Sequence, residues 1–163
     1  MTGLDYDREK VRLLNAGESY IRDVPTADLA PHVKARTLAA TADRAILAEA
    51  DAVVVCVPTP LNKTKEPDMR FIVEATTEIA KHQHPGMLVV LESTTYPGTT
   101  DEVVVPKLTE GGAVLGKDVF VAFSPERVDP GNPTYQTKNI PKVVGGSTAE
   151  CTTTGALFYA QAL

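Results

Sequence analysis

The side chains that could do chemistry lie in two loops, each directly after an apolar run. Thr59 lies between Pro58 and Pro60, and because both prolines fix φ, its loop can face a cofactor with little ordering cost. Glu126 can take part in proton transfer if it lies within hydrogen-bond reach of a reacting group. Each has a simpler interpretation. Pro-x-Pro is common where a strand ends in a loop, and a surface Glu126 paired with Arg127 would contribute little.

The elements around these loops indicate a parallel α/β sheet. Four apolar runs are predicted as strands, at residues 51–57, 87–91, 119–123 and 142–144. They lack a period of two, as expected of strands that helices cover on both faces. Ligands bind beyond the carboxyl ends of strands in such sheets. Both loops, 58–67 and 124–133, therefore lie where a site is expected.

Helices are predicted between these strands, one of them over residues 69–81, where Ile72, Ala75 and Ile79 have helical spacing. Three other helices begin at side chains suited to capping the first turn: Asp7, Thr100 and Thr148. The helix after Asp7 is expected to end near Gly17. The helix after Thr100 meets Pro106, which cannot donate a backbone hydrogen bond, so a kink is expected there.

Composition excludes several classes of protein. The net charge of -5, without a run of Lys or Arg, argues against binding of nucleic acid. No stretch resembles a signal peptide or a membrane span, so a cytoplasmic protein is expected. Cys56 and Cys151 match no metal-ligand spacing, the three histidines form no ligand set, and we expect no bound metal. Cys56 lies inside an apolar run and is predicted to be a reduced core thiol.

Four segments together resemble the UDP-glucose/GDP-mannose dehydrogenase family. They are Gly3-Leu-Asp5 with Lys10 after it, Val57-Pro-Thr-Pro60, Glu92-Ser-Thr-Thr-Tyr-Pro-Gly-Thr-Thr100 and Ser124-Pro-Glu-Arg-Val-Asp-Pro-Gly131. Their order and spacing also match, and the last two are most similar to the UDP-N-acetylhexosamine branch. The resemblance implies a Rossmann-like, doubly wound parallel sheet. It also implies NAD-dependent oxidation of a sugar's 6-hydroxymethyl group to a carboxylate in two steps.

The sequence also departs from this family. The family's first strand and Gly-rich turn are not found, nor are its middle helical region and C-terminal domain, which carry the catalytic cysteine and its partner lysine. Neither Cys56 nor Cys151 lies in a matching motif. Because the first strand of such a sheet is central, the strands at residues 3–5 and 53–57 should lack their shared neighbour. We expect residues 1–163 to be a partial NAD-binding domain, with 148–163 starting a following helix.

The resemblance assigns cofactor contacts to Asp5, Lys10 and the segment Val57, Pro58 and Thr59. An acidic residue at the end of the second strand can accept both ribose hydroxyls of the adenosine. It would repel a 2′-phosphate, so Asp5 favours NAD over NADP. The alternative for Asp5 is a plain turn residue before the helix, and for Lys10 a solvated lysine on a helix face.

The resemblance places Thr95 and Glu126 at the reaction. Thr95 would lie near the nicotinamide and order a water by hydrogen bonding, since its hydroxyl is no base unaided; the alternative is an ordinary turn threonine. Glu126 would orient the water that hydrolyses a thioester formed at the second oxidation. Arg127, Val128 and Asp129 would then line the sugar substrate.

The expected whole enzyme is therefore an NAD-dependent nucleotide-sugar 6-dehydrogenase, a homodimer acting on a UDP-sugar. The 163 residues alone are expected to be inactive. An alternative from another class is a non-catalytic Rossmann-like fragment or interaction module that binds nucleotide weakly. A further one, a Rossmann methyltransferase, would need a Gly-rich turn after a first strand, and this sequence has none.

Overall fold

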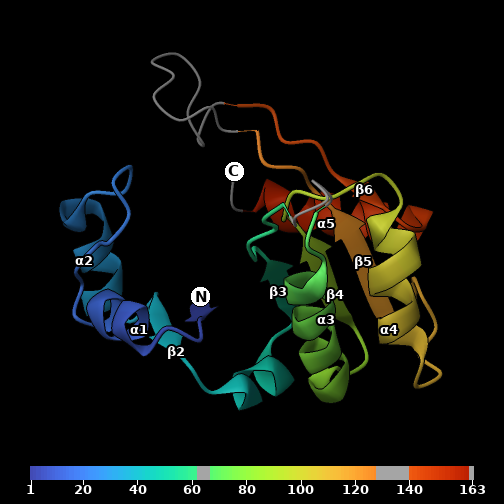
Figure 1. Ribbon diagram of the computed structural model, residues 1–163, viewed down its shortest axis with the longest axis horizontal. Helices are drawn as coiled ribbons and strands as arrows, with labels where there is room; N and C mark the ends of the chain where they lie inside the picture. The colour runs from blue at the N-terminus through green and yellow to red at the C-terminus, as the bar shows by residue number, and fades with distance from the viewer. Residues whose placement is uncertain (62–66, 128–139, 162–163) are drawn as a thin grey trace. The chain divides into compact units, whose positions relative to one another are not determined.

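The structure is a computed structural model and describes residues 1–61, 67–127 and 140–161 (Figure 1). It divides into two compact units, Met1–Ile46 and Leu47–Leu163. The short 3₁₀ helix η1 (Arg44–Glu49) contains the boundary between them. The sheets are separate as well: β1 and β2 form one, and β3 to β6 form another. The strands expected to lack a shared neighbour thus belong to different sheets.

The first unit contains a two-stranded parallel sheet and two helices. β1 (Thr2–Leu4) pairs with β2 (Ala39–Thr41), and α1 (Arg8–Asn15) and α2 (Thr26–Lys34) lie between them in the chain. The Asn15 amide ties α1 to β2, because its Nδ2 donates to the Ala40 carbonyl and its Oδ1 accepts from the Ala40 N–H, both at 2.8 Å.

Both predicted ends of α1 are confirmed. The Asp7 carboxylate accepts hydrogen bonds from the backbone N–H groups of Glu9 and Lys10, which satisfies donors that the helix leaves open. After the helix, Gly17 adopts a φ of 75°. The N–H groups of Gly17 and Glu18 then reach back to carbonyls of the last turn, each at 2.9 Å. This is a Schellman motif, and it needs a residue that tolerates positive φ.

The second unit is built on the sheet β3-β4-β5-β6. β3 (Ala52–Val55), β4 (Met87–Leu91) and β5 (Val119–Phe123) are parallel, with Val53 opposite Val89 and Val89 opposite Val121. All five residues of β4 are buried. A central strand buried on both faces is what a continuous apolar run predicts, so the three predicted strands are confirmed.

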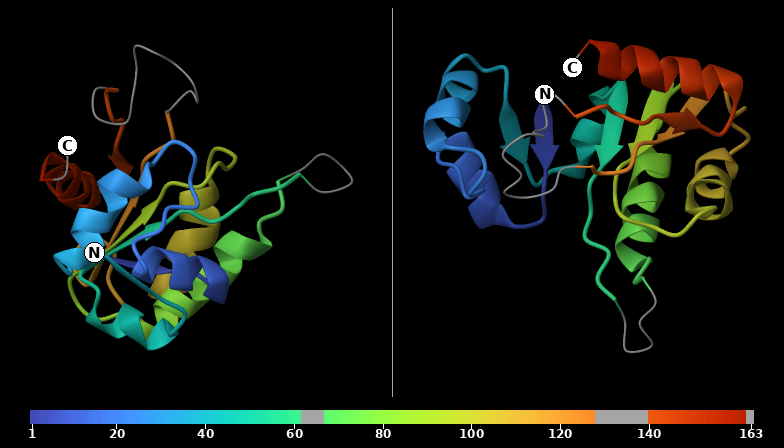
Figure 2. Two further views of the ribbon diagram at one scale, coloured as in Figure 1. Left: turned by 90° about the vertical axis from the view of Figure 1, so that its left-hand side faces the viewer. Right: turned by 90° about the horizontal axis from the view of Figure 1, so that it is seen from above.

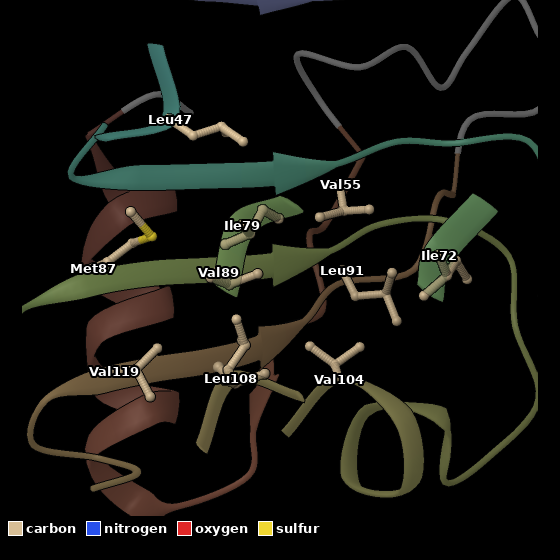
Figure 3. Packing of buried hydrophobic residues seen from close by; sticks show 11 residues of the cluster. Leu47, Val55, Ile72, Ile79, Met87, Val89, Leu91, Val104, Leu108 and Val119 are labelled. Carbon is tan, nitrogen blue, oxygen red and sulfur yellow. The ribbon is translucent and has the colours of Figure 1, made fainter. Parts of the chain in front are cut away.

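Helices cover both faces of this sheet, which confirms the α/β class (Figure 2). On one face, α3 (Arg70–His82) and α4 (Val105–Thr109) pack Ile72, Ile79 and Leu108 against alternate residues of β4 and β5, as Figure 3 shows. On the other face, α5 (Ala149–Ala160) packs Phe158 and Tyr159 near Leu88, Val90 and Ala122.

Thr148 caps α5 as predicted, because its hydroxyl accepts a hydrogen bond from the Cys151 N–H at 3.2 Å. The cap predicted at Thr100 is wrong. Thr100 is the first residue of a π-helical turn, η2 (Thr100–Val104), and the Thr99 hydroxyl before it donates to the Tyr96 carbonyl. The irregularity expected at Pro106 takes the form of this π turn, after which α4 starts with the proline in its first turn.

The fourth strand is displaced from its predicted position. Residues 142–144 form no strand, and β6 (Gly145–Gly146) pairs antiparallel with the end of β5. The Val143 carbonyl accepts a hydrogen bond from the Ser124 hydroxyl at 2.8 Å and not from the backbone N–H of a neighbouring strand. The elements α2 and β2 were not predicted. α2 contains Pro31 and has no side-chain cap, and β2 has only three residues, two of them alanine.

Candidate functional site

Asp5 directly follows β1, and each oxygen of its carboxylate interacts with a nearby residue. Oδ1 accepts a hydrogen bond of 2.9 Å from the Asp7 N–H, and Oδ2 lies 3.7 Å from the Lys10 ammonium. The Asp5 side chain is 41% exposed, so further acceptor positions remain open to a ligand. An ordered, accessible carboxylate meets the chemical requirement for accepting the hydroxyls of a ribose.

The loop after β3 is anchored by Ser93, a buried residue that sequence reasoning missed. Its hydroxyl accepts a hydrogen bond from the Val57 N–H at 2.8 Å and donates to the Val55 carbonyl at 3.2 Å. The Val57 amide is therefore satisfied inside the protein. Of the segment predicted to meet a cofactor, Pro58 is exposed and Thr59 is half-buried.

Thr95 immediately precedes a tight turn. The Thr99 N–H bonds to the Tyr96 carbonyl at 3.3 Å, and Gly98 between them has a φ of 99°. With Pro97 in the preceding position, this is the pattern of a type II turn. Thr95 is half-buried, and its hydroxyl lies 3.4 Å from the Tyr96 carbonyl, a weak hydrogen bond. The hydroxyl can thus turn to a ligand at little cost.

Glu126 is positioned through Ser124, which is fully buried at the end of β5. The Ser124 N–H donates to the Leu91 carbonyl at 3.0 Å, and its hydroxyl donates to the Val143 carbonyl at 2.8 Å. Glu126 itself is exposed, and its Oε1 accepts a hydrogen bond of 2.7 Å from the Arg127 N–H. Val128 and Asp129, predicted to line the substrate, lie outside the described residues.

The parallel strands bring part of the predicted site together. Because β3, β4 and β5 run in the same direction, their carboxyl ends lie at one edge of the sheet. The segments with Thr59, Thr95 and Glu126 follow these three ends. Asp5 and Lys10 belong to the other unit.

Glu92 connects the end of β4 with three other segments, a role that sequence reasoning missed. Its carboxylate receives hydrogen bonds from Lys142 at 2.5 Å, from the Tyr159 hydroxyl, and from the Cys56 thiol at 3.4 Å. Burial alone would raise the pKa of Glu92, but the Lys142 and Tyr159 hydrogen bonds outweigh it and lower that pKa. Burial and the same carboxylate raise the pKa of Tyr159.

Cys56 is not the core thiol that the apolar run predicted. It lies after the last residue of β3 and is exposed, whereas Cys151 is the buried cysteine. Partial burial raises the pKa of the Cys56 thiol to about 12, and the negative charges of Glu92 and Glu126 contribute to the rise. The thiol at this edge is therefore protonated at neutral pH and a poor nucleophile.

In the described part of the chain, no three His, Cys, Asp or Glu side chains gather in a way that could hold a metal ion. Nor does any helix among residues 1–61, 67–127 and 140–161 have the length and apolar character needed to cross a membrane.

Known proteins resemble this chain over nearly all of it. The sequence model of the UDP-glucose/GDP-mannose dehydrogenase family, NAD binding domain, matches residues 1–163. Protein CapL of Staphylococcus aureus is 36% identical over 149 residues, which is 91% of this chain and 34% of that protein. The UDP-N-acetyl-D-glucosamine 6-dehydrogenase of Pseudomonas aeruginosa is 34% identical over 151 residues, 92% of this chain and 35% of the enzyme.

Solved structures agree with the sequence matches. The NDP-N-acetyl-D-galactosaminuronic acid dehydrogenase from Methanosarcina mazei Go1 superposes with a TM-score of 0.88 at 31% identity. That match covers 99% of this chain and 36% of the other. The chain thus spans about a third of the length of the relatives that it matches.

Proposed function

Because this chain belongs to the UDP-glucose/GDP-mannose dehydrogenase family, whose NAD binding domain it matches throughout, we propose an activity for the whole protein. It oxidises the 6-hydroxymethyl group of a UDP-N-acetylhexosamine to a carboxylate with NAD as the oxidant. The choice of sugar is supported by the P. aeruginosa relative, which is named for UDP-N-acetyl-D-glucosamine.

The cofactor contacts are those that the family resemblance assigns, and they are proposed residue by residue. Asp5 accepts the adenosine ribose hydroxyls on its accessible oxygens, beside Lys10. Thr59 and Pro58 meet the cofactor from a segment that Ser93 anchors through Val57. When bound, NAD takes up one hydride in each of two oxidations.

The oxidation balances with one water. Converting –CH₂OH to –COO⁻ consumes a water and releases two hydrides and three protons, so a residue must place that water and receive its proton. Glu126 is our candidate for this step, since its carboxylate is accessible and its backbone follows the buried Ser124. Thr95 orders the water or the reacting oxygen by hydrogen bonding. The thiol that carries the sugar between the two oxidations comes from the family's catalytic cysteine, which neither Cys56 nor Cys151 matches.

The observation that carries this proposal is the common edge of β3, β4 and β5, which the segments of Thr59, Thr95 and Glu126 all follow. To test it, the full-length protein is mixed with NAD and UDP-N-acetylglucosamine or UDP-N-acetylmannosamine. We expect two NADH for each carboxylate formed. Glu126→Gln should lower turnover about a hundredfold or more while the Kd for NAD stays nearly constant.

Glu110→Gln is the matched control, because Glu110 lies on the surface, 74% exposed, and pairs only loosely with Lys107 at 3.5 Å. Unchanged turnover of the Glu126 variant would overturn that residue's role. If the full-length protein binds NAD but oxidises no UDP-sugar, the alternative of a non-catalytic nucleotide-binding module stands instead.

We propose further that residues 1–163 alone give no NADH with these sugars and bind NAD only weakly, which calorimetry would measure beside the full-length protein. In the family that this chain resembles, a Gly-rich turn and the N-terminus of the following helix hold the pyrophosphate of NAD. That turn is not found among residues 1–163. The full-length protein is expected to be a homodimer, which light scattering would check.

A further inference from the structure

Glu92 lies at the carboxyl edge of the sheet and bonds to three distant segments of the chain. It follows the last residue of β4, and its side chain is only 17% exposed. Its three partners come from far along the chain: Cys56, Lys142 and Tyr159 are 36, 50 and 67 residues away. One carboxylate thus joins the end of β3, the segment before β6, and α5.

Glu92 and Lys142 form an ion pair that is largely shielded from water, so each charge depends on the other. The Lys142 side chain is 20% exposed, so both charges are largely removed from water. The Lys142 ammonium also lies 4.9 Å from the centre of the Tyr159 ring, whose hydroxyl donates to the same carboxylate. Removing one partner would leave the other charge partly buried without compensation. Lys142 is therefore held by Glu92, which follows β4, and by Tyr159 of α5.

This fixed lysine lies next to the residue that holds Ser124. The Val143 carbonyl accepts the Ser124 hydroxyl, and the Ser124 N–H bonds to Leu91, the neighbour of Glu92. The end of β5 is therefore held between Leu91 and Val143. Glu126 follows Ser124 by two residues, so the place of Glu126 depends on where Lys142 and Val143 lie.

We infer that Glu92 is a positioning residue for the hydrolytic step. It anchors Lys142, and through Val143 and Ser124 it keeps Glu126 in place at the edge. This inference rests on the proposed function, in which Glu126 directs the water. Because Glu92 acts through Glu126 and not on the cofactor, its loss should slow hydrolysis and leave the hydride steps and NAD affinity nearly unchanged.

The experiment uses the full-length protein and compares Glu92→Gln and Lys142→Met with the control Lys107→Met, which removes an exposed lysine of α4. Stopped-flow measurement of NADH separates the first turnover from the steady state, and intact-mass spectrometry detects sugar bound to the enzyme as a thioester. A displacement of the order of an ångström costs about a hundredfold in rate. We expect steady-state carboxylate formation to fall about tenfold to a hundredfold, with a normal first NADH burst and accumulation of the adduct.

A milder variant keeps the test valid if these proteins fold poorly. Tyr159→Phe removes one hydrogen bond to Glu92 and leaves the ion pair, so it should show a smaller defect in the same step. An equal slowing of the burst and the steady state, or a lower melting temperature with normal kinetics, would overturn the inference.

The outcomes also separate this inference from the proposed function. If the unmutated protein forms no NADH, the proposed function fails. If Glu126→Gln accumulates the adduct and Glu92→Gln does not, the proposed function stands and the positioning role of Glu92 fails.

Discussion

The Lys10 ammonium lies 3.7 Å from the Asp5 carboxylate, so the acid that follows β1 has its counter-ion beside it. Both groups are more than a third exposed, and such a pair stabilises the fold only slightly. In the proposed NAD site this pair would matter for the choice of cofactor. Asp5 would repel a 2′-phosphate, and Lys10 would attract one if Asp5 were replaced.

Replacing Asp5 should therefore change cofactor preference. Hydrogen bonds to a charged group contribute about 1.5–3 kcal/mol, so Asp5→Ala in the full-length protein should lower kcat/KM for NAD about tenfold to a hundredfold. NADP should gain at the same time, because Lys10 is released. Asp5→Ala combined with Lys10→Met should lose that gain. Equal use of both cofactors by the unmutated enzyme would contradict the assignment.

Cys56 should be slow to alkylate although it is exposed. Its pKa is raised to about 12 by partial burial and by Glu92 and Glu126. Compared with an ordinary thiol, its thiolate population below pH 8 is lower on the order of a thousandfold. Glu92→Gln removes one negative charge and leaves Lys142 nearby, which lowers that pKa. Iodoacetamide should therefore modify the variant faster than the unmutated chain.

Mass spectrometry of the 163-residue chain gives this rate cleanly, since it has two cysteines and Cys151 is fully buried. Cys56→Ser serves as the control and should show almost no labelling while folded. Rapid labelling of Cys56 at pH 7 in the unmutated chain would show that the carboxylates do not act on the thiol as described.

The Glu92–Lys142 pair should make stability depend on acid. The pKa of Glu92 is lowered in the folded state from an ordinary value of 4.5, because the Lys142 and Tyr159 hydrogen bonds outweigh burial. A lowered folded pKa means stability that is present above the unfolded value and is lost as pH falls through the folded value. The melting temperatures of the unmutated chain and of Glu92→Gln should thus differ at pH 7 and converge as the pH falls below 4.5 and through the lower folded-state pKa. Glu110→Gln, at an exposed pair, should differ little from the unmutated chain at every pH; a Glu92→Gln difference that persists in acid would contradict the linkage.

The parts of the fold that are predictable from sequence are those with local signals. β4 is a five-residue apolar run, and α1 begins at a capping Asp7 and ends at Gly17. Each depends on residues within a few positions of one another, so the pattern and the structure agree. The loops that follow β3 and β5 are predictable for the same reason, because strand ends determine where they begin.

The remaining parts depend on contacts between distant residues. Glu92 begins the family-like segment 92–100, yet its partners are 36 to 67 residues away and no local pattern links them. Cys56 has an apolar neighbourhood in sequence, but it is exposed because β3 ends one residue earlier. The strand predicted at residues 142–144 lies instead at Gly145–Gly146, and the Val143 carbonyl accepts the hydroxyl of Ser124, 19 residues earlier in the chain.

The two glycines of β6 offer a matched pair of substitutions that isolates one close contact. A Cβ built on Gly146 would lie 2.5 Å from the Cys151 carbonyl carbon and 2.6 Å from its Cβ, and the Gly146 N–H donates to the Thr152 hydroxyl at 3.0 Å. Gly145 has no atom within 4 Å of the same position. The start of α5 thus approaches the backbone of β6 at Gly146 alone.

Gly146→Ala should therefore destabilise the chain, while Gly145→Ala should not. The added methyl group meets backbone atoms of α5, which cannot rotate away as a flexible side chain could, so α5 must shift from β5 and β6. Overpacking of this kind costs about 1–3 kcal/mol. Gly145→Ala changes the same intrinsic strand preference and the same unfolded-state entropy without the clash, so its effect should be within about 0.5 kcal/mol of zero.

Urea unfolding followed by far-ultraviolet circular dichroism measures the free energy of unfolding of both variants. Equal stability of the two variants would show that α5 does not lie as close to Gly146 as described. A loss at Gly146 with none at Gly145 would place the cost in the contact between β6 and α5, the helix that also carries Tyr159 to Glu92.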